Sequence, residues 1–340
     1  MSARRPPAGI ISLDALRFRR RLRPDPTYKS VMVEFLHSFV FRPYVTLFLL
    51  GFLALSWLEQ GRARTAIWLM TGYLVALAAE WGSINHGIPF GFYTYHYDVL
   101  KDDLVVFGVP FFDSLSFAFL SYVSFSFAQF FLSPHWRRGL DVQRVTSRNL
   151  RNSGAVLFLG AFFMTVLDLV TDPVAHLGKH WFLGDIYHYP EPGWHFDVTL
   201  ANYAGWFVVG WVIIFINQRL DWLLSRRELA LDKPVTLRHI PAKGMFAPLF
   251  WFGIAAFTLG VTAWLGWAYD LELVPLAQRE SFVAETRKLF LSGMFIMAPI
   301  LVLAWAHLVR RGSHPSPEQL TAWLQDYPNP GLKSRISEPP

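Results

Sequence analysis

Two acidic residues, Asp168 and Asp172, stand in an otherwise apolar stretch of the sequence. Four residues apart, they fall one turn apart on the same face of a helix. A charged side chain at membrane depth costs roughly 2.5–3.5 kcal/mol, so Asp168 indicates a functional role. Two neighbouring carboxyl groups favour holding a proton between them, which suits a general acid and its companion base. For Asp172 a structural alternative stands beside this one, because Asp followed by Pro173 is a typical start of a new helix.

Two further acids border apolar segments. Glu80 ends one such segment, where its carboxylate either reaches the membrane interface or faces the aspartates as a third catalytic acid. Asp113 stands early in the next segment, where an inward-facing structural hydrogen bond and a catalytic role are equally compatible with its position. We group Glu80 with the catalytic candidates and Asp113 with the substrate-binding candidates.

Histidines suggest a different chemistry. His176 and His180 are four residues apart, the spacing at which one helix offers two imidazoles to a metal ion. With Asp168, Asp172 or Glu80 as further ligands, this pattern is typical of a zinc-dependent seven-span membrane hydrolase. The sequence has no second clustered histidine motif and no cysteine. We therefore expect no metal and no other cofactor, and keep the zinc hydrolase as the alternative.

Two polar loops share a short motif. Tyr95-His96-Tyr97 follows Glu80 by 15–17 residues, and Tyr187-His188-Tyr189 follows Asp172 by the same spacing. An internal duplication and a coincidence of three common residues both explain this similarity.

Long apolar segments must position these residues. Of the 340 residues 53% are hydrophobic and only 16% are charged, against about 25% charged in a soluble domain. Since about 20 apolar residues span a bilayer, the sequence predicts an all-α polytopic membrane bundle of seven helices, with an eighth crossing at residues 31–41 as an alternative. The seven segments are Tyr44–Leu58, Thr65–Ile84, Val109–Leu132, Gly154–Thr171, Val198–Ile216, Phe246–Tyr269 and Leu289–Val309.

The distribution of charged and apolar residues predicts that the chain is divided into three regions. Residues 1–30 form a basic tail suited to anionic lipid, residues 31–309 the transmembrane domain, and residues 310–340 a polar, proline-rich tail with one short helix after Ser316. Basic residues concentrate after the third and fifth segments, which predicts that those loops are cytoplasmic. The loops after the second and fourth segments must share one side, because two spans separate them. We expect an integral protein of a bacterial cytoplasmic membrane.

Four motifs in order carry a family resemblance. They are Gly87-Ile-Pro89-Phe90-Gly91-Phe-Tyr93-Thr-Tyr95, Gly108-Val109-Pro110, Asp168 with Asp172-Pro173, and Asn202-Tyr-Ala-Gly205-Trp206. Between Ala79 and Phe207 the sequence resembles the membrane carotenoid biosynthesis proteins of the CruF hydratase type.

The resemblance implies a cofactor-independent hydratase that adds water to the terminal double bond of an acyclic carotenoid. Asp168, Asp172 and Glu80 would be its catalytic acids, and a lipophilic carotenoid, membrane lipid and other carotenoid biosynthesis enzymes its partners, with no nucleic acid. A non-enzymatic carotenoid-binding membrane protein is the second alternative. The residues expected to bind substrate are Tyr93, Tyr95, His96, Asp113, His188, Asn202 and Trp206.

Overall fold

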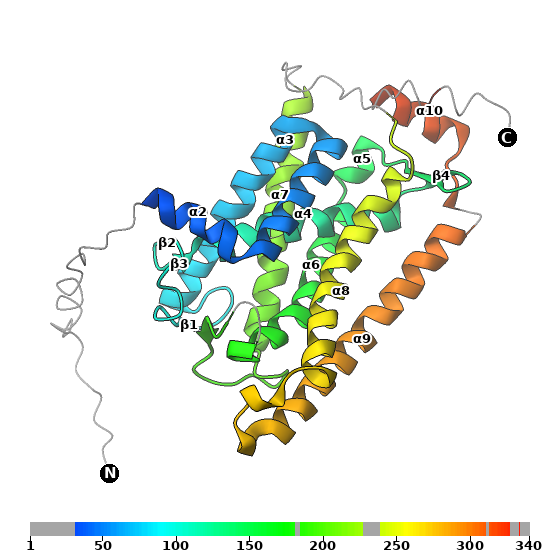
Figure 1. Cartoon of the computed structure of the whole chain (residues 1–340). Coiled ribbons are helices and arrows are strands. Elements are labelled where there is room, and N and C mark those ends of the chain that lie inside the picture. Colours follow the sequence, from blue (N-terminus) through cyan, green and yellow to red (C-terminus); the bar gives the residue numbers. More distant parts are fainter. Residues whose placement is uncertain (1–30, 181–183, 227–238, 311–312, 327–332, 334–340) are drawn as a thin grey trace, which may run out of the picture.

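The protein is a bundle of long helices joined by compact loops (Figure 1). The computed structural model describes residues 31–180, 184–226, 239–310, 313–326 and 333. Three two-stranded ribbons lie in the loops, formed by β1 (Thr94–Tyr95) with β6 (Tyr187–His188), β2 (Val105–Val106) with β3 (Val109–Pro110), and β4 (His135–Arg138) with β5 (Asp141–Arg144). The α-helices are α2 (Val31–Phe41), α3 (Pro43–His86), α4 (Phe111–Leu132), α5 (Arg148–Arg151), α6 (Gly154–Ala175), α7 (Leu200–Arg226), α8 (Phe246–Trp267), α9 (Arg279–Val309) and α10 (Pro317–Asp326).

Helix α3 contains the first two predicted segments and folds back on itself. Within the described residues six helices are long and apolar enough to cross a membrane, and α3 is the first of them. Its helical geometry breaks at Gly61 (φ 84°, ψ 169°). The hydroxyls of Ser56 and Thr65 are hydrogen-bonded at 2.8 Å, whereas nine residues of straight helix would separate them by about 13.5 Å. The chain therefore reverses direction at Gly61.

Contacts with α4 confirm that the two limbs of α3, residues 43–60 and 62–86, are antiparallel. In the first limb the residue numbers of α3 and α4 rise together, as in the ring contacts Phe48–Phe119 and Phe52–Tyr122. In the second limb they run in opposite order, as in the hydrogen bonds Trp68–Ser121 and Glu80–Ser114. Each of the seven predicted segments thus has its own helical limb, and the prediction of a helical membrane bundle is confirmed.

We expect Gly61→Ala to lower the free energy of unfolding by roughly 1–3 kcal/mol, because this backbone conformation is essentially restricted to glycine. Denaturant titration of the purified protein in detergent measures the change. Gly253→Ala is the matched control, since a Cβ there meets no atom within 4 Å and alanine favours a helix by about 0.5–1 kcal/mol. Equal effects of the two substitutions would contradict the role assigned to Gly61.

Helix α4 lies at the centre of the bundle. It packs against both limbs of α3 and against α6, α7 and α8. Small residues allow the closest approaches: a Cβ on Gly72 would lie 2.7 Å from the Ala118 Cα, and one on Gly160 would lie 3.3 Å from the Phe125 Cα. Such approaches are typical of helix packing in membranes.

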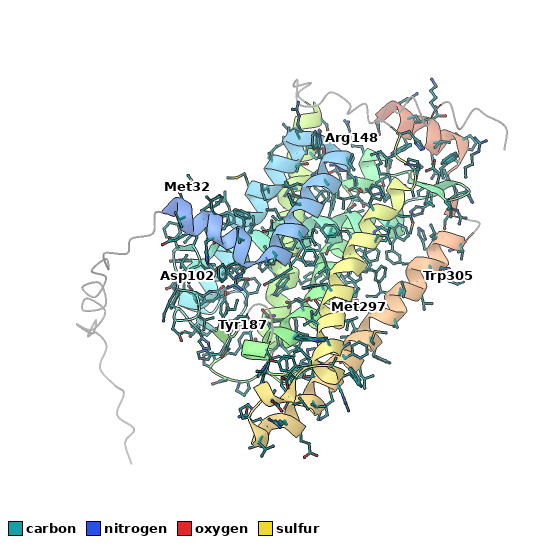
Figure 2. The ribbon with its side chains drawn as sticks, viewed as in Figure 1. Met32, Asp102, Arg148, Tyr187, Met297 and Trp305 are labelled. Atoms are coloured by element: carbon teal, nitrogen blue, oxygen red, sulfur yellow. The ribbon has the colours of Figure 1, made fainter. Side chains whose placement is uncertain are left out.

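The two ends of the bundle differ in their loops. The β1–β6 ribbon joins the loops after the second and fourth apolar segments, pairing Thr94 with His188 and Tyr95 with Tyr187. The prediction that these loops lie on one side is thereby confirmed. In Figure 2 Tyr187 marks this end and Arg148 marks the opposite one, where the β4–β5 ribbon, α5 and α10 are found (Figure 1).

Two predictions at the chain ends have different outcomes. The eighth crossing is not confirmed, because the 11 described residues of α2 extend about 16 Å against a bilayer core of about 30 Å. The short helix after Ser316 is confirmed as α10, with the Ser316 hydroxyl accepting from the Gln319 N–H at 3.2 Å. The basic tail of residues 1–30 lies outside the described residues.

Candidate active site

A polar cavity of about 350 Å³ opens at the end of the bundle that carries the β1–β6 ribbon. It brings together acids, tyrosines and an amide. They come from the second limb of α3, from α4, α6 and α7, and from both polar loops. Its walls are Glu80, Phe90, Tyr93, Tyr95, Asp113, Phe117, Asp172, Tyr187, Tyr189, Asn202 and Trp206.

The paired aspartates lie on one face of α6, as their spacing predicts. Asn202 at the start of α7 donates from its amide nitrogen to Asp168 at 2.8 Å and to Asp172 at 2.9 Å. Asp168 is 2% exposed. The alternative in which Asp172 starts a new helix is wrong, because α6 runs on to Ala175 with Pro173 inside it. Asp172 is therefore available for chemistry.

Two tyrosines that the sequence analysis did not select complete the setting of Asp172. The hydroxyl of Tyr187 donates to one carboxyl oxygen, and that of Tyr189 to the other at 3.3 Å. Burial, followed by the nearby Asp172 carboxyl, raises the pKa of both phenols well above 10. Both hydroxyls therefore keep their protons and act as donors. The repeated Tyr-His-Tyr triplet was the signal that could have identified them.

Glu80 and Asp113 approach the same cavity from α3 and α4. Ser114 donates its hydroxyl proton to Glu80 at 2.8 Å, and Tyr95 donates to Asp113 at 2.6 Å. The Tyr93 hydroxyl lies 3.4 Å from that of Tyr95. Three carboxyl groups, those of Glu80, Asp113 and Asp172, thus face this cavity, each with a hydroxyl or amide donor.

The loop that carries Tyr93 and Tyr95 is held close to α7. Gly87 ends α3 in the left-handed conformation (φ 73°), and the Phe90 N–H donates to the Ser83 hydroxyl at 2.9 Å. A Cβ on Gly205 would lie 2.4 Å from the Phe90 ring, so glycine at this position allows the loop to pack onto α7.

A second, larger cavity of about 790 Å³ adjoins the first and is mostly apolar. Asp168 lines this second cavity, whereas Asp113, Asp172, Tyr187 and Trp206 line both. Trp206 stacks on Phe117 with ring centroids 4.4 Å apart. The remaining walls are Tyr44, Val45, Phe48, Phe112, Ser116, Phe119, Leu120, Thr171, Ala175, Ile186, Ile254, Phe257 and Thr258. The aspartate pair therefore stands at the boundary between a polar and an apolar space.

His96 and His188, which the sequence analysis expects to bind substrate, line neither cavity. They hydrogen-bond to each other at 2.6 Å on the outer side of the β1–β6 ribbon, and His96 also contacts the Asp185 carbonyl at 2.8 Å. Successive residues of a strand face opposite sides, so the neighbouring tyrosines point inward while these imidazoles point outward.

The two histidines of the zinc alternative do not share a helix. Because α6 ends at Ala175, His176 lies in a turn and His180 in a separate short 3-10 helix. His176 packs on the rings of Tyr187 and Tyr189, whereas His180 contacts the Tyr269 hydroxyl at 2.9 Å. Across the described ranges, no three His, Cys, Asp or Glu residues are grouped so that they could hold a metal ion. The prediction that His176 and His180 share one helix, on which the zinc alternative depended, is therefore wrong.

Comparison with known proteins adds one finding. Residues 41–274 match a family model described as carotenoid biosynthesis protein. No curated protein and no solved structure matches the sequence. The matched range includes both limbs of α3, helices α4 to α8 and every residue that lines the two cavities.

Proposed function

Because this chain belongs to the carotenoid biosynthesis protein family, we propose that it is a hydratase that adds water to the terminal double bond of an acyclic carotenoid. Its apolar helices and its family make it a membrane protein, in which a lipophilic substrate would reach the bundle from the lipid. The observation that carries the proposal is the buried aspartate pair between an apolar cavity and a polar one.

The first step in this proposal is protonation of the alkene. The substrate end lies in the apolar cavity, and Asp168 transfers its proton to the less substituted carbon of the terminal double bond. The π electrons form the new C–H bond and leave a cation on the tertiary carbon. Aromatic faces stabilise a nearby cation, and Trp206 and Tyr187, which line both cavities, supply such faces.

Water then attacks the tertiary cation from the polar cavity. Asp172 accepts the proton that the water loses. Return of this proton to Asp168 restores the acid, so the net change is one alkene and one water converted into a tertiary alcohol. Three donors, from Tyr187, Tyr189 and Asn202, contact Asp172, whereas Asn202 alone is described as donating to Asp168. Hydrogen bonds from donors favour the ionised form of a carboxyl group, which supports Asp172 as the base and Asp168 as the acid.

Pigment analysis tests the proposal. The chain is expressed in a host that produces lycopene, and the pigments are extracted and analysed by chromatography and mass spectrometry. We expect a new carotenoid heavier by one water per reacted end, with a tertiary hydroxyl. Unchanged lycopene that copurifies with the protein would instead support a non-enzymatic carotenoid-binding protein.

Metal removal separates the hydratase from the zinc hydrolase. Proton transfer from a carboxyl group requires no Lewis acid, and each cavity carboxyl already has a protein donor. We therefore expect a chelator to leave the rate of hydration by the purified protein unchanged. Loss of activity with the chelator, restored by zinc, would contradict this and would return His176 and His180 to consideration.

A further inference from the structure

A third cavity, of about 480 Å³, lies at the opposite end of the bundle from the carboxyl groups. It is enclosed by the first limb of α3, the β4–β5 ribbon, α5, the segment before α8, and α10. Its walls are Glu59, Arg144, Thr146, Arg151, Lys243, Gly244 and Trp323. The proposed hydration chemistry uses none of these residues.

Backbone packing places Lys243 beside Arg144. A Cβ on Gly244 would lie 2.7 Å from the Arg144 nitrogen and 2.9 Å from the Val142 oxygen, so only glycine allows this approach. Ala242, the residue before Lys243, adopts a left-handed conformation (φ 56°), and its N–H donates to Asp141 at 3.0 Å. The fold thus accepts backbone strain at a position that brings two cations together.

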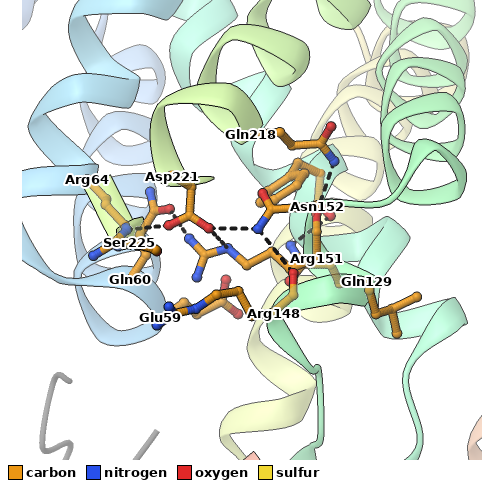
Figure 3. A network of polar contacts seen from close by, with 12 residues as sticks. Glu59, Gln60, Arg64, Gln129, Arg148, Arg151, Asn152, Gln218, Asp221 and Ser225 are labelled. Carbon is orange, nitrogen blue, oxygen red and sulfur yellow. Dashed lines mark hydrogen bonds and ion pairs between the residues drawn. The ribbon is translucent and has the colours of Figure 1, made fainter. Parts of the chain in front are cut away.

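Cations outnumber acids in this region. Arg144 forms an ion pair with Glu59 at 3.0 Å and also donates to the Ser126 carbonyl oxygen at 2.7 Å. Arg151 donates to the Gln60 amide oxygen at 2.7 Å. The adjoining network, seen in Figure 3, adds Arg64 and Asp221, which are ion-paired. Among the described residues that line the cavity, three are cations (Arg144, Arg151 and Lys243) and one is an acid (Glu59), and the neighbouring Arg64–Asp221 ion pair adds no net charge.

Lys243 is a cation of this cavity whose charge has no close partner among the described residues. Within the described ranges its ammonium group forms no hydrogen bond or ion pair, and its main electrostatic neighbours are Glu59, which attracts it, and Arg144, which repels it. Glu59 is already engaged by Arg144 and by the hydroxyls of Tyr122 and Ser126, at 2.8 and 2.6 Å. Buried charges are expensive unless they are paired, so this arrangement favours an added anion.

We propose that this cavity is a binding site for a phosphate group. Arg144 of β5, Arg151 of α5 and Lys243 before α8 supply guanidinium and ammonium donors, which suit the binding of a phosphate group. A phosphate bearing between one and two negative charges balances the excess of two cations. The cavity lies at the end where the basic loops of the sequence gather, which suits the phosphate of a lipid headgroup as well as a free phosphate. Trp323 of α10 closes the cavity and packs on Val145.

Two binding measurements on the full-length protein in detergent distinguish the sources. Calorimetric titration with inorganic phosphate tests the free ion, and native mass spectrometry after exposure to phosphatidylglycerol tests the headgroup. We expect binding in at least one arm, with Lys243→Gln weakening it at least tenfold and Lys243→Arg restoring it. Phosphate binding in calorimetry identifies the free ion as a ligand, and retention of lipid alone identifies the headgroup.

Arg148→Gln is the matched control, because it removes one positive charge at the same end from a residue that does not line the cavity. Thermal unfolding checks that every variant is folded. The proposal is overturned if the wild-type protein binds in neither arm, or if Arg148→Gln weakens binding as much as Lys243→Gln. Neither measurement uses a carotenoid, so the outcome is independent of the proposed hydratase activity.

Discussion

Asp168→Asn should yield a folded protein that forms almost no hydroxylated carotenoid. Asparagine keeps the shape of the side chain and its contact with Asn202, which lies 2.8 Å from Asp168, but it has no acidic proton. A general acid typically contributes about 100- to 10,000-fold to a rate, and protonation of an unactivated alkene has no easier route. We therefore expect a loss of at least this size in the initial rate of hydration, measured with purified protein and carotenoid in detergent.

Asp98→Asn is the matched control, since Asp98 is an exposed acid at the same end of the bundle that lines neither cavity. Its rate should equal that of the wild-type protein. If Asp168→Asn remained active, Asp168 would not be the acid, and Glu80 and Asp113 would be the next candidates because both face the polar cavity.

Asp172→Asn should also reduce hydration by roughly 100-fold or more, because the attacking water loses its base. Tyr187→Phe should reduce it by a smaller factor, about 10- to 150-fold, since a hydrogen bond to a charged group contributes about 1.5–3 kcal/mol. Tyr187 acts through the Asp172 carboxyl group that it contacts. The double variant should therefore be no slower than Asp172→Asn alone, which initial rates of all four proteins will show.

Tyr97→Phe is the control for the tyrosine substitution. Its hydroxyl donates to the Gly108 carbonyl at 2.9 Å and lines neither cavity, so we expect a wild-type rate. Independent, multiplicative losses in the Asp172 and Tyr187 variants would contradict the coupling. A fully active Asp172→Asn protein would transfer the role of base to Glu80 or Asp113, the other acids at the polar cavity.

The positions of the apolar segments and the shared helix face of the two aspartates can be predicted from the amino-acid sequence. Both follow from short-range regularities: the length of chain needed to cross a bilayer, and the helical period that places Asp168 and Asp172 on one face. The shared side of the two polar loops follows from counting spans. These properties do not depend on which helices are neighbours.

Which polar side chains join the aspartates depends on how distant segments pack in the folded chain. Tyrosine and histidine alternate in both Tyr-His-Tyr triplets, and the pairing of β1 with β6 determines that Tyr95 and Tyr187 face inward while His96 and His188 face outward. The sequence alone could not distinguish the inward-facing tyrosines from the outward-facing histidines, because strand alternation specifies opposite faces without specifying which face is buried.

The same holds for the contacts between distant helices. Asn202 bridges both aspartates from 30 or more residues away, and Lys243 lies beside Arg144 because the backbones of their segments pack at Gly244. Local patterns also misplaced the end of α6, where the Asp172-Pro173 pair is typical of a helix start although the helix continues through it to Ala175. Packing against α7 and the two loops outweighs that local preference. Contacts of this kind depend on which segments the bundle brings together, which local spacing does not specify.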